Sequence, residues 1–175
     1  MNGRLEPAGD LWRLRFTRKL AHSPEKVWRA ITEQQHLKAW FPDEIELPSP
    51  LETGGRVRFN SPYRSEIFES EIIECTPPAV LEFRWDTNDT LRFEIRADGD
   101  GCELTLLDTF DELGKAARDA AGWHTCLAAF EAELDGVPAP SQSQDDWKQL
   151  FASYSEQFGP AASSIGPPAE HPYSE

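Results

Sequence analysis

KAARDAAGWHTCLAAFEAELD, residues 115–135, is the stretch of sequence that decides the fold. Its large apolar residues recur at i, i+4, i+7 and i+11, which places them on one face of an α-helix; they are Trp123, Leu127, Phe130 and Leu134. Gly136 follows as a typical C-cap, and Pro138 prevents the helix from continuing. The spacing predicts a helix roughly 30 Å long, enough to lie across a whole small sheet.

The residues before this helix predict an antiparallel sheet. Apolar residues alternate with charged or polar ones in the segments 12–17, 56–59, 81–85, 91–96 and 103–106. Weaker strands are expected at 44–47 and 67–75, and the DGDG sequence at 98–101 is a strong hairpin signal. Because short turns join these strands, they form a meander with one covered and one solvent-exposed face. We expect the helix at 115–135 to cover the apolar face.

Two short helices are predicted between the first strand and the rest of the sheet. Ser23, Pro24 and Glu25 combine an N-cap, a proline at the first helical position and an acid in the first turn. Thr32 and Gln35 have the spacing of a capping box for a second helix, which ends at Pro42. Together these elements predict an α+β domain.

The sequence outside the domain divides by composition. We expect a flexible N-terminus at 1–10, the domain at 11–136, a linker at 137–144 and a disordered tail at 159–175. An additional amphipathic helix is predicted at 145–158, where the apolar residues at helical spacing are Trp147, Leu150, Phe151, Tyr154 and Phe158. This helix is expected to pack on its own domain, near the strands or the short helices. Packing on a second subunit is the alternative, so the chain is a monomer or a homodimer.

The net charge of −14 excludes several classes of partner. Nucleic acid and anionic membrane surfaces would both repel the chain. The three cysteines have no CxxC spacing and are expected to be reduced thiols of a cytoplasmic protein. No apolar run approaches 18 residues and no basic-then-apolar leader is present, so neither membrane insertion nor export is expected.

No catalytic, metal or cofactor motif stands out. None of the four histidines has a partner at metal-ligand spacing, and GxSxG, P-loop and GxGxxG patterns are absent, so no metal and no cofactor is predicted. The candidate acid–base residues are His124, beside the apolar face of the helix, and Asp108, which continues the inward phase of its strand. Their alternative interpretations are a boundary residue of the helix and a cap at the end of the strand.

Aromatic residues are the better functional signal. By phase they project into one interior, where they either fill the core or leave space for a ligand on a concave sheet. The predicted ligand-binding residues are Trp40, Phe59, Phe83, Trp85, Phe93, Trp123, Leu127 and Phe130.

Several short motifs, in order and spacing, resemble a known family over about residues 11–135. They are SPEKVW at 23–28, Trp40, Gly54-Gly55, Pro77-Pro78 with the strand 81–85, Asp98-Gly99, and Gly122-Trp123. The set resembles the bacterial proteins similar to the C-terminal domain of the activators of the heat-shock-protein-90 ATPase, within the START-like (SRPBCC) superfamily. This resemblance implies a helix-grip fold, a curved antiparallel sheet wrapped around a long C-terminal helix, with two short helices after the first strand.

The resemblance also implies a hydrophobic cavity between the sheet and the long helix. It does not imply a chaperone role. Other branches of the superfamily bind lipids, cyclise polyketides or sequester reactive natural products. The function expected here is non-enzymatic binding of a small hydrophobic or aromatic molecule. The alternatives are a cyclase- or hydrolase-type enzyme that uses His124 or Asp108, and a co-chaperone-like interaction protein.

Overall fold

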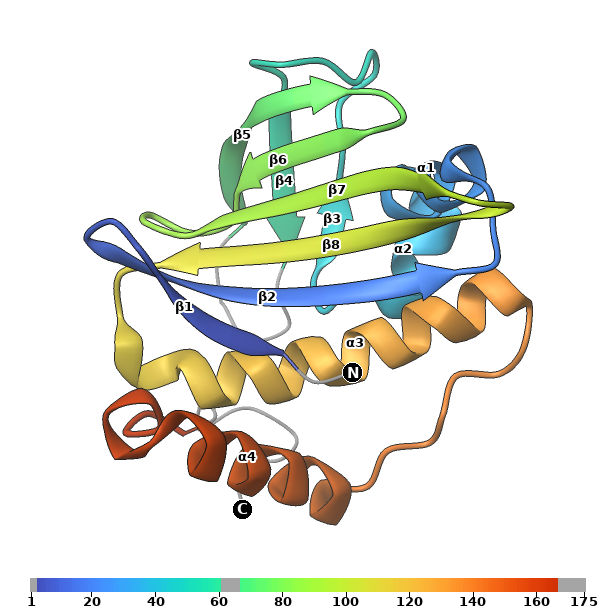
Figure 1. The fold of residues 1–175 in the computed structure, drawn as a ribbon. Coiled ribbons are helices and arrows are strands. Elements are labelled where there is room, and N and C mark those ends of the chain that lie inside the picture. Colours follow the sequence, from blue (N-terminus) through green and yellow to red (C-terminus); the bar gives the residue numbers. More distant parts are fainter. Residues whose placement is uncertain (1–2, 61–66, 167–175) are drawn as a thin grey trace.

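The computed structural model describes residues 3–60 and 67–166 of the 175-residue chain. Its centre is one curved, unclosed sheet of eight antiparallel strands, in the order β1-β2-β8-β7-β6-β5-β4-β3 (Figure 1). The strands are β1 (Arg4–Ala8), β2 (Leu11–Leu20), β3 (Glu44–Glu46), β4 (Arg56–Asn60), β5 (Phe68–Thr76), β6 (Val80–Arg84), β7 (Thr90–Asp98) and β8 (Gly101–Phe110).

Four α-helices accompany the sheet. They are α1 (Pro24–Thr32), α2 (Gln34–Trp40), α3 (Ala116–Asp135) and α4 (Gln144–Phe158), with short 3-10 turns η1 (Leu113–Lys115) and η2 (Pro160–Ala162). Helix α3 runs along the inner face of the sheet, and α4 lies on the side of α3 that faces away from it (Figure 1). The α+β helix-grip architecture is therefore confirmed, with a second helical layer beneath the long helix.

Local sequence explains where the helices begin and end. The Ser23 hydroxyl accepts a hydrogen bond from the Lys26 amide at the start of α1. Gly136 ends α3 in the left-handed region, with φ of 67°, where glycine carries no steric penalty. The predicted Thr32 capping box is wrong: Thr32 lies in the last turn of α1 and donates to the Trp28 carbonyl, and α2 begins at Gln34 without a side-chain cap.

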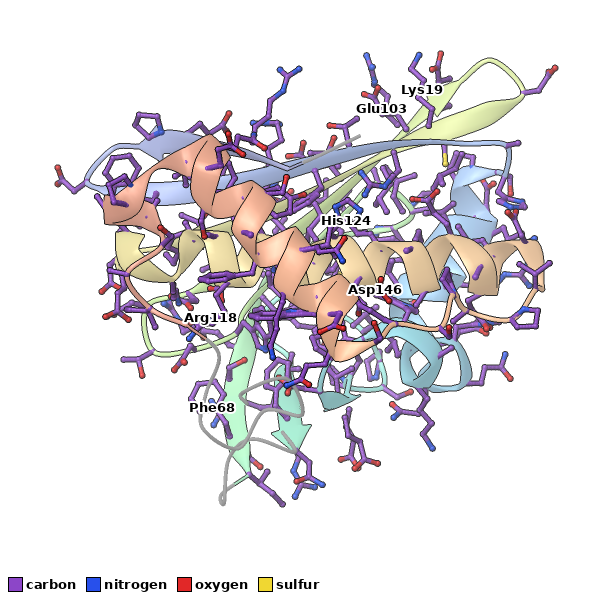
Figure 2. All side chains as sticks on the ribbon, turned by 90° about the horizontal axis from the view of Figure 1, so that it is seen from below. Lys19, Phe68, Glu103, Arg118, His124 and Asp146 are labelled. Carbon is purple, nitrogen blue, oxygen red and sulfur yellow. The ribbon has the colours of Figure 1, made fainter. Side chains whose placement is uncertain are left out.

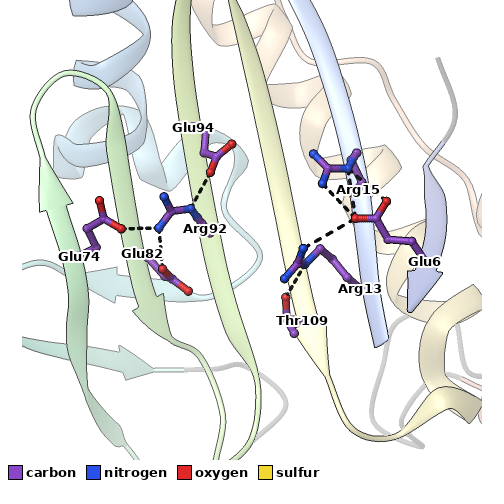
Figure 3. Close-up of polar contacts among 8 residues, drawn as sticks. All are labelled: Glu6, Arg13, Arg15, Glu74, Glu82, Arg92, Glu94 and Thr109. Carbon is purple, nitrogen blue, oxygen red and sulfur yellow. Dashed lines mark hydrogen bonds and ion pairs between the residues drawn. The ribbon is translucent and has the colours of Figure 1, made fainter. Parts of the chain in front are cut away.

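The two faces of the sheet differ as the alternation predicts. Inward-facing residues of β8 such as Leu104, Leu106 and Phe110 are almost completely buried. On the outer face, Arg92 of β7 pairs with carboxylates on β5, β6 and β7 itself, from Glu74, Glu82 and Glu94 (Figure 3). Arg15 and Glu6 make a similar cross-strand pair between β2 and β1. These partly exposed pairs fix the outer face in register and contribute little stability each.

Both ends of the chain differ from the sequence predictions. The expected flexible N-terminus is wrong for Arg4–Ala8, which form β1 because they pair with β2 along its length. The expected disordered tail is wrong for residues 160–166: η2 follows α4, and the Ile165 amide donates to the Gly114 carbonyl in the loop before α3. Residues 1–2 and 167–175, which belong to the same predictions, lie outside the described residues.

Helix α4 packs on its own chain, but on α3 rather than on the strands or short helices that we expected. A capping box between Ser143 and Asp146 begins it. Its Tyr154 hydroxyl accepts from the Gly3 amide at 3.0 Å and lies 3.0 Å from the His124 imidazole of α3. The Gln157 amide donates to the Gly3 carbonyl. Helix α4 thereby joins the N-terminal edge of the sheet to α3.

Candidate functional site

The inner face of the sheet, α2 and α3 bring eight aromatic side chains into one group, which we call the aromatic cluster. Each ring lies 4.9–6.3 Å from at least one other, centroid to centroid. Its members are Trp40, Phe41, Phe59, Phe83, Trp85, Phe93, Trp123 and Phe130. All seven aromatic residues that the sequence predicted as ligand-binding are included, and Leu127 is buried on the same face of α3.

The rings of the aromatic cluster pack against one another. Trp85 is half-buried, and the other seven are buried, Phe41 being the most exposed of these at 8%. Most contacts are edge-to-face or tilted, which are the favourable arrangements for aromatic pairs. A ligand that binds among these rings must therefore part some of them.

The aromatic cluster reaches the molecular surface beside β3 and β4. Phe41 lines an open hollow of about 530 Å³ together with Lys38, Pro42, Asp43, Glu44 and Asn60. Phe59 lines a smaller hollow of about 90 Å³ that shares Glu44 and Asn60 with the first. Two rings of the interior are thus accessible from one side of the molecule.

Trp85 connects this surface to the interior. Its indole N–H donates to the Asp43 carboxylate at 2.9 Å, next to Phe41 in the open hollow. Its ring lies 4.9 Å from that of Trp123, deeper in the cluster. Trp85 is the one half-buried ring of the cluster, and a single side-chain hydrogen bond holds its indole to the rim.

Asp108 places a polar group against the rings on the inner face. It extends from β8 toward α3, is 1% exposed, and accepts a hydrogen bond from the Trp123 indole N–H through Oδ2 at 2.9 Å. Its other oxygen, Oδ1, is buried and has no hydrogen-bond partner among the described residues. Burial, followed by the charge of Asp119, raises the pKa of Asp108 well above its ordinary value, which favours the neutral form of this carboxyl group.

A buried ion pair lies next to this acid at the start of α3. The Lys115 ammonium contacts Asp89 and lies 3.9 Å from Asp119. Burial lowers the pKa of Lys115, but Asp119 and Asp89 outweigh burial and the net shift is upward. Lys115 is therefore charged and contacts two anionic partners, while its charge also acts on Asp108 against the effect of burial.

His124 follows Trp123 and lies about 100° further around α3, where its imidazole contacts Tyr154 of α4 (Figure 2). Burial, followed by the charge of Arg18, lowers the pKa of His124. The neutral imidazole accepts the Tyr154 O–H through Nδ1, since the same hydroxyl accepts from Gly3. Asp108 of β8 bonds to Trp123 and His124 contacts Tyr154 of α4, so the two candidate acid–base residues have different partners and do not form a pair.

Neither a metal-binding group nor a membrane-spanning helix occurs in the described part of the chain. Residues 3–60 and 67–166 contain no cluster of three or more His, Cys, Asp or Glu side chains suited to a metal ion. No helix within the same ranges is long and apolar enough to cross a bilayer.

Sequence reasoning missed two parts of the site. Phe41 directly follows α2, and no local pattern shows that its ring meets Trp85 and Trp123 while also lining a surface hollow. The sequence also could not show that one oxygen of Asp108 lacks a partner, because hydrogen-bond partners are known only from the three-dimensional structure. The one indication in the sequence was the alternation of the strand, which places Asp108 on the inner face of the sheet.

Comparisons with known proteins agree with the fold. The family model of the Activator of Hsp90 ATPase homolog 1-like proteins matches residues 21–135. The structure of EF2215, a conserved protein of unknown function from Enterococcus faecalis, has a TM-score of 0.70 at 21% identity and covers 89% of each chain. CalU16 from Micromonospora echinospora has a TM-score of 0.66 at 17% identity, covering 90% of this chain and 94% of its own.

A third solved structure resembles a smaller share of this chain. MLL2253 from Mesorhizobium loti has a TM-score of 0.62 at 19% identity and covers 71% of this chain but 97% of its own. At these identities the likeness shows the fold alone. No curated protein matches the chain. The family match ends at Asp135, before the linker and α4.

Proposed function

The chain belongs to the family of Activator of Hsp90 ATPase homolog 1-like proteins, and from this premise we propose that it binds a small hydrophobic or aromatic molecule without changing it chemically. The ligand would occupy the space between the sheet and α3, within the START-like (SRPBCC) helix-grip domain. The observation that carries the proposal is the aromatic cluster, whose Phe41 and Phe59 line adjoining surface hollows.

The geometry supports a specific route of entry. A planar molecule that enters past Phe41 meets Trp85, whose displacement breaks one hydrogen bond to Asp43. It can then insert between the Trp85 and Trp123 rings, so that one of its faces contacts each ring. Aromatic contacts of this kind contribute about 0.5–1.5 kcal/mol beyond the burial of surface area.

The test is a fluorescence titration and a thermal-shift measurement with two apolar probes, 2-isopropenylnaphthalene and 2-acetylnaphthalene. We expect wild-type protein to be stabilised by both. Trp85→Leu should weaken binding about threefold to tenfold, the ratio that corresponds to one aromatic contact. The matched control is Trp28→Leu: Trp28 is also half-buried, but it lies on α1, near the other end of α3.

Two results would count against the proposal. One is that neither probe stabilises the wild-type protein. The other is that Trp28→Leu weakens binding as much as Trp85→Leu. Native mass spectrometry of the purified protein adds an independent measurement, because a co-purified ligand appears as a mass increment that Trp85→Leu reduces.

The two alternative functions receive less support. An enzyme that used His124 or Asp108 would need that residue beside the ligand, but His124 contacts Tyr154 of α4 and Asp108 is bonded to the Trp123 indole. For an interaction protein, the large hydrophobic side chains exposed in the described part of the chain are Ile67, Ile73 and Val137. The first two lie six positions apart along an extended segment and the third follows α3, so they do not combine into one patch. A cytoplasmic location stays a prediction from the reduced cysteines.

A further inference from the structure

One hydroxyl group of α4 connects three parts of the molecule that are distant in sequence. The Tyr154 oxygen lies 3.0 Å from the Gly3 amide nitrogen and 3.0 Å from Nδ1 of His124 on α3. The Tyr154 ring also packs edge-on against Phe16, which belongs to the inner face of β2. Because Tyr154 is only 2% exposed, this meeting point of α4, α3 and the N-terminal segment is enclosed.

The chemistry of the groups fixes the direction of both hydrogen bonds. A backbone amide only donates, so the Tyr154 oxygen accepts from Gly3 and its own proton is available for one acceptor. Burial raises the pKa of Tyr154, so the hydroxyl keeps that proton. Nδ1 of His124 can accept it only in the neutral imidazole, since both ring nitrogens of the imidazolium are donors. The docked position of α4 therefore favours a neutral His124.

Protonation of His124 would disturb this arrangement in two ways. The imidazolium would turn Nδ1 into a donor, and the enclosed Tyr154 proton would lose its acceptor, which is costly for a buried polar group. The new charge would also be repelled by Arg18 of β2 and by the amino terminus of the chain. Glu131 of α3 favours the charge, but its carboxylate already lies 2.6 Å from Nε of Arg18.

We propose that His124 is a proton-sensitive switch for the docking of α4, so that protonation of its imidazole loosens α4 from α3 and from the N-terminal segment. The inference is independent of the proposed ligand. It assigns a regulatory role to the part of the chain that follows the family domain. Release of Tyr154 would uncover Phe16, and with it the β2 side of the interior.

The sign of the pH dependence follows from the two states of His124. In the docked state, burial and then the charge of Arg18 lower its pKa. In the released state the imidazole is in water and has its ordinary pKa of about 6.5. The released state therefore binds more protons, and docking weakens as the pH falls through about 6.5. For one proton, the ratio of released to docked molecules rises by up to about tenfold between about pH 7.5 and about pH 5.5.

Other contacts of α4 do not titrate in this range and limit the size of the effect. The Gln157 side-chain amide donates to the Gly3 carbonyl, and Trp147 is buried in the docked state. Neither contact changes when His124 takes up a proton. The switch therefore adjusts how often α4 is released and does not abolish its docking.

The experiment is amide hydrogen exchange on the full-length protein, followed by NMR for residues 148–158 of α4. Exchange rates are divided by the intrinsic chemical rate at each pH, which gives the ratio of open to closed α4. We expect this ratio to rise by up to about tenfold in the wild-type protein between about pH 7.5 and about pH 5.5.

Two variants show whether His124 is the group responsible. His124→Gln keeps a side-chain oxygen as an acceptor for the Tyr154 hydroxyl but cannot take up a proton, so the rise should disappear. The matched control is His36→Gln, because His36 lies on α2 and its Nδ1 contacts Glu133 rather than α4. This variant should show the same rise as the wild-type protein.

A direct measurement on the wild-type protein completes the test. The nitrogen-15 shifts of the His124 ring should show an unprotonated Nδ1 at neutral pH and a titration below the ordinary histidine pKa. A protonated Nδ1 at neutral pH would overturn the inference, as would a pH-independent opening of α4 or an undiminished rise in His124→Gln. Because the ring is observed in the wild-type protein, the test holds even if His124→Gln does not fold.

Discussion

Asp108 makes the stability of the chain depend on pH through one enclosed carboxyl group. Its pKa is raised in the folded state, first by burial and then by the charge of Asp119. The folded chain therefore holds a proton that the unfolded chain releases, and the free energy of unfolding falls as the pH rises from the unfolded pKa toward the folded one. Asp108→Asn cannot ionise, so we predict that it gains stability relative to wild type as the pH rises from about 4.

Asp146 provides the control with the opposite sign in the same urea-unfolding series. Hydrogen bonds from the Ser143 amide and hydroxyl lower the pKa of Asp146. Its contribution is present above its ordinary pKa and lost as the pH falls through the lowered value. Asp146→Asn should therefore lose stability at neutral pH and approach wild type in acid. A pH-independent difference between Asp108→Asn and wild type would show that Asp108 titrates normally.

Tyr154→Phe tests the hydroxyl that joins α4 to both α3 and the N-terminus. The variant removes the acceptor of the Gly3 amide, which is buried, and the donor to His124. We predict a loss of about 1–3 kcal/mol in the free energy of unfolding, because a buried donor is left unpaired. The control is Ser155→Ala, because the Ser155 hydroxyl donates to the Phe151 carbonyl within its own helix. Equal effects of the two variants would contradict the prediction.

At the scale of elements, the periodic pattern of α3 predicted one buried face of the helix but not the other. Its large apolar residues predicted the face that packs on the sheet, and Trp123, Leu127 and Phe130 are buried there. The opposite face includes three buried alanines, Ala117, Ala121 and Ala132, which carry little hydrophobic signal. Burial of part of this second face is typical of a helix in an inner layer, and α4 supplies the outer one.

Removal of α4 is the prediction at this scale. A chain that ends at Gly136 loses the packing of Trp147 and Tyr154, both buried. Each fully buried aromatic side chain contributes roughly 1.5–3 kcal/mol, so the melting temperature should fall by many degrees. Because α4 packs on its own chain, the mass in solution should remain that of a monomer. The control ends at Gly166 and should melt like the full chain; a full-length dimer that dissociates on truncation would refute packing in cis.

For the molecule as a whole, the net charge of −14 is the dominant electrostatic fact. Like charges repel within the compact state, and salt screens them over a Debye length of about 10 Å at 0.1 M. Salt also weakens the ion pairs of the outer face, but exposed pairs contribute little. We predict that thermal stability rises by a few degrees between about 10 mM and about 200 mM sodium chloride. A fall would mean that the outer-face pairs outweigh the net charge.

The sequence predicted the middle of the molecule better than its ends. Alternation and helical spacing are local, so the sheet, the short helices and α3 could be recognised segment by segment. β1 contains Pro7 and does not alternate clearly, and it is a strand because β2 pairs with it. In the site, strand phase identified the aromatic residues that meet. It could not show the Trp85–Asp43 bond or the free oxygen of Asp108, which depend on residues distant in sequence.

The bond between Gly3 and Tyr154 also has a consequence for the order in which the protein is made. A ribosome releases the N-terminus first, and the partner of the Gly3 amide follows 151 residues later. β2 likewise has to wait for β8, which is its neighbour in the sheet. At synthesis rates of about 5–20 residues per second, the first strand made waits on the order of 10 to 30 seconds for the helix that secures it.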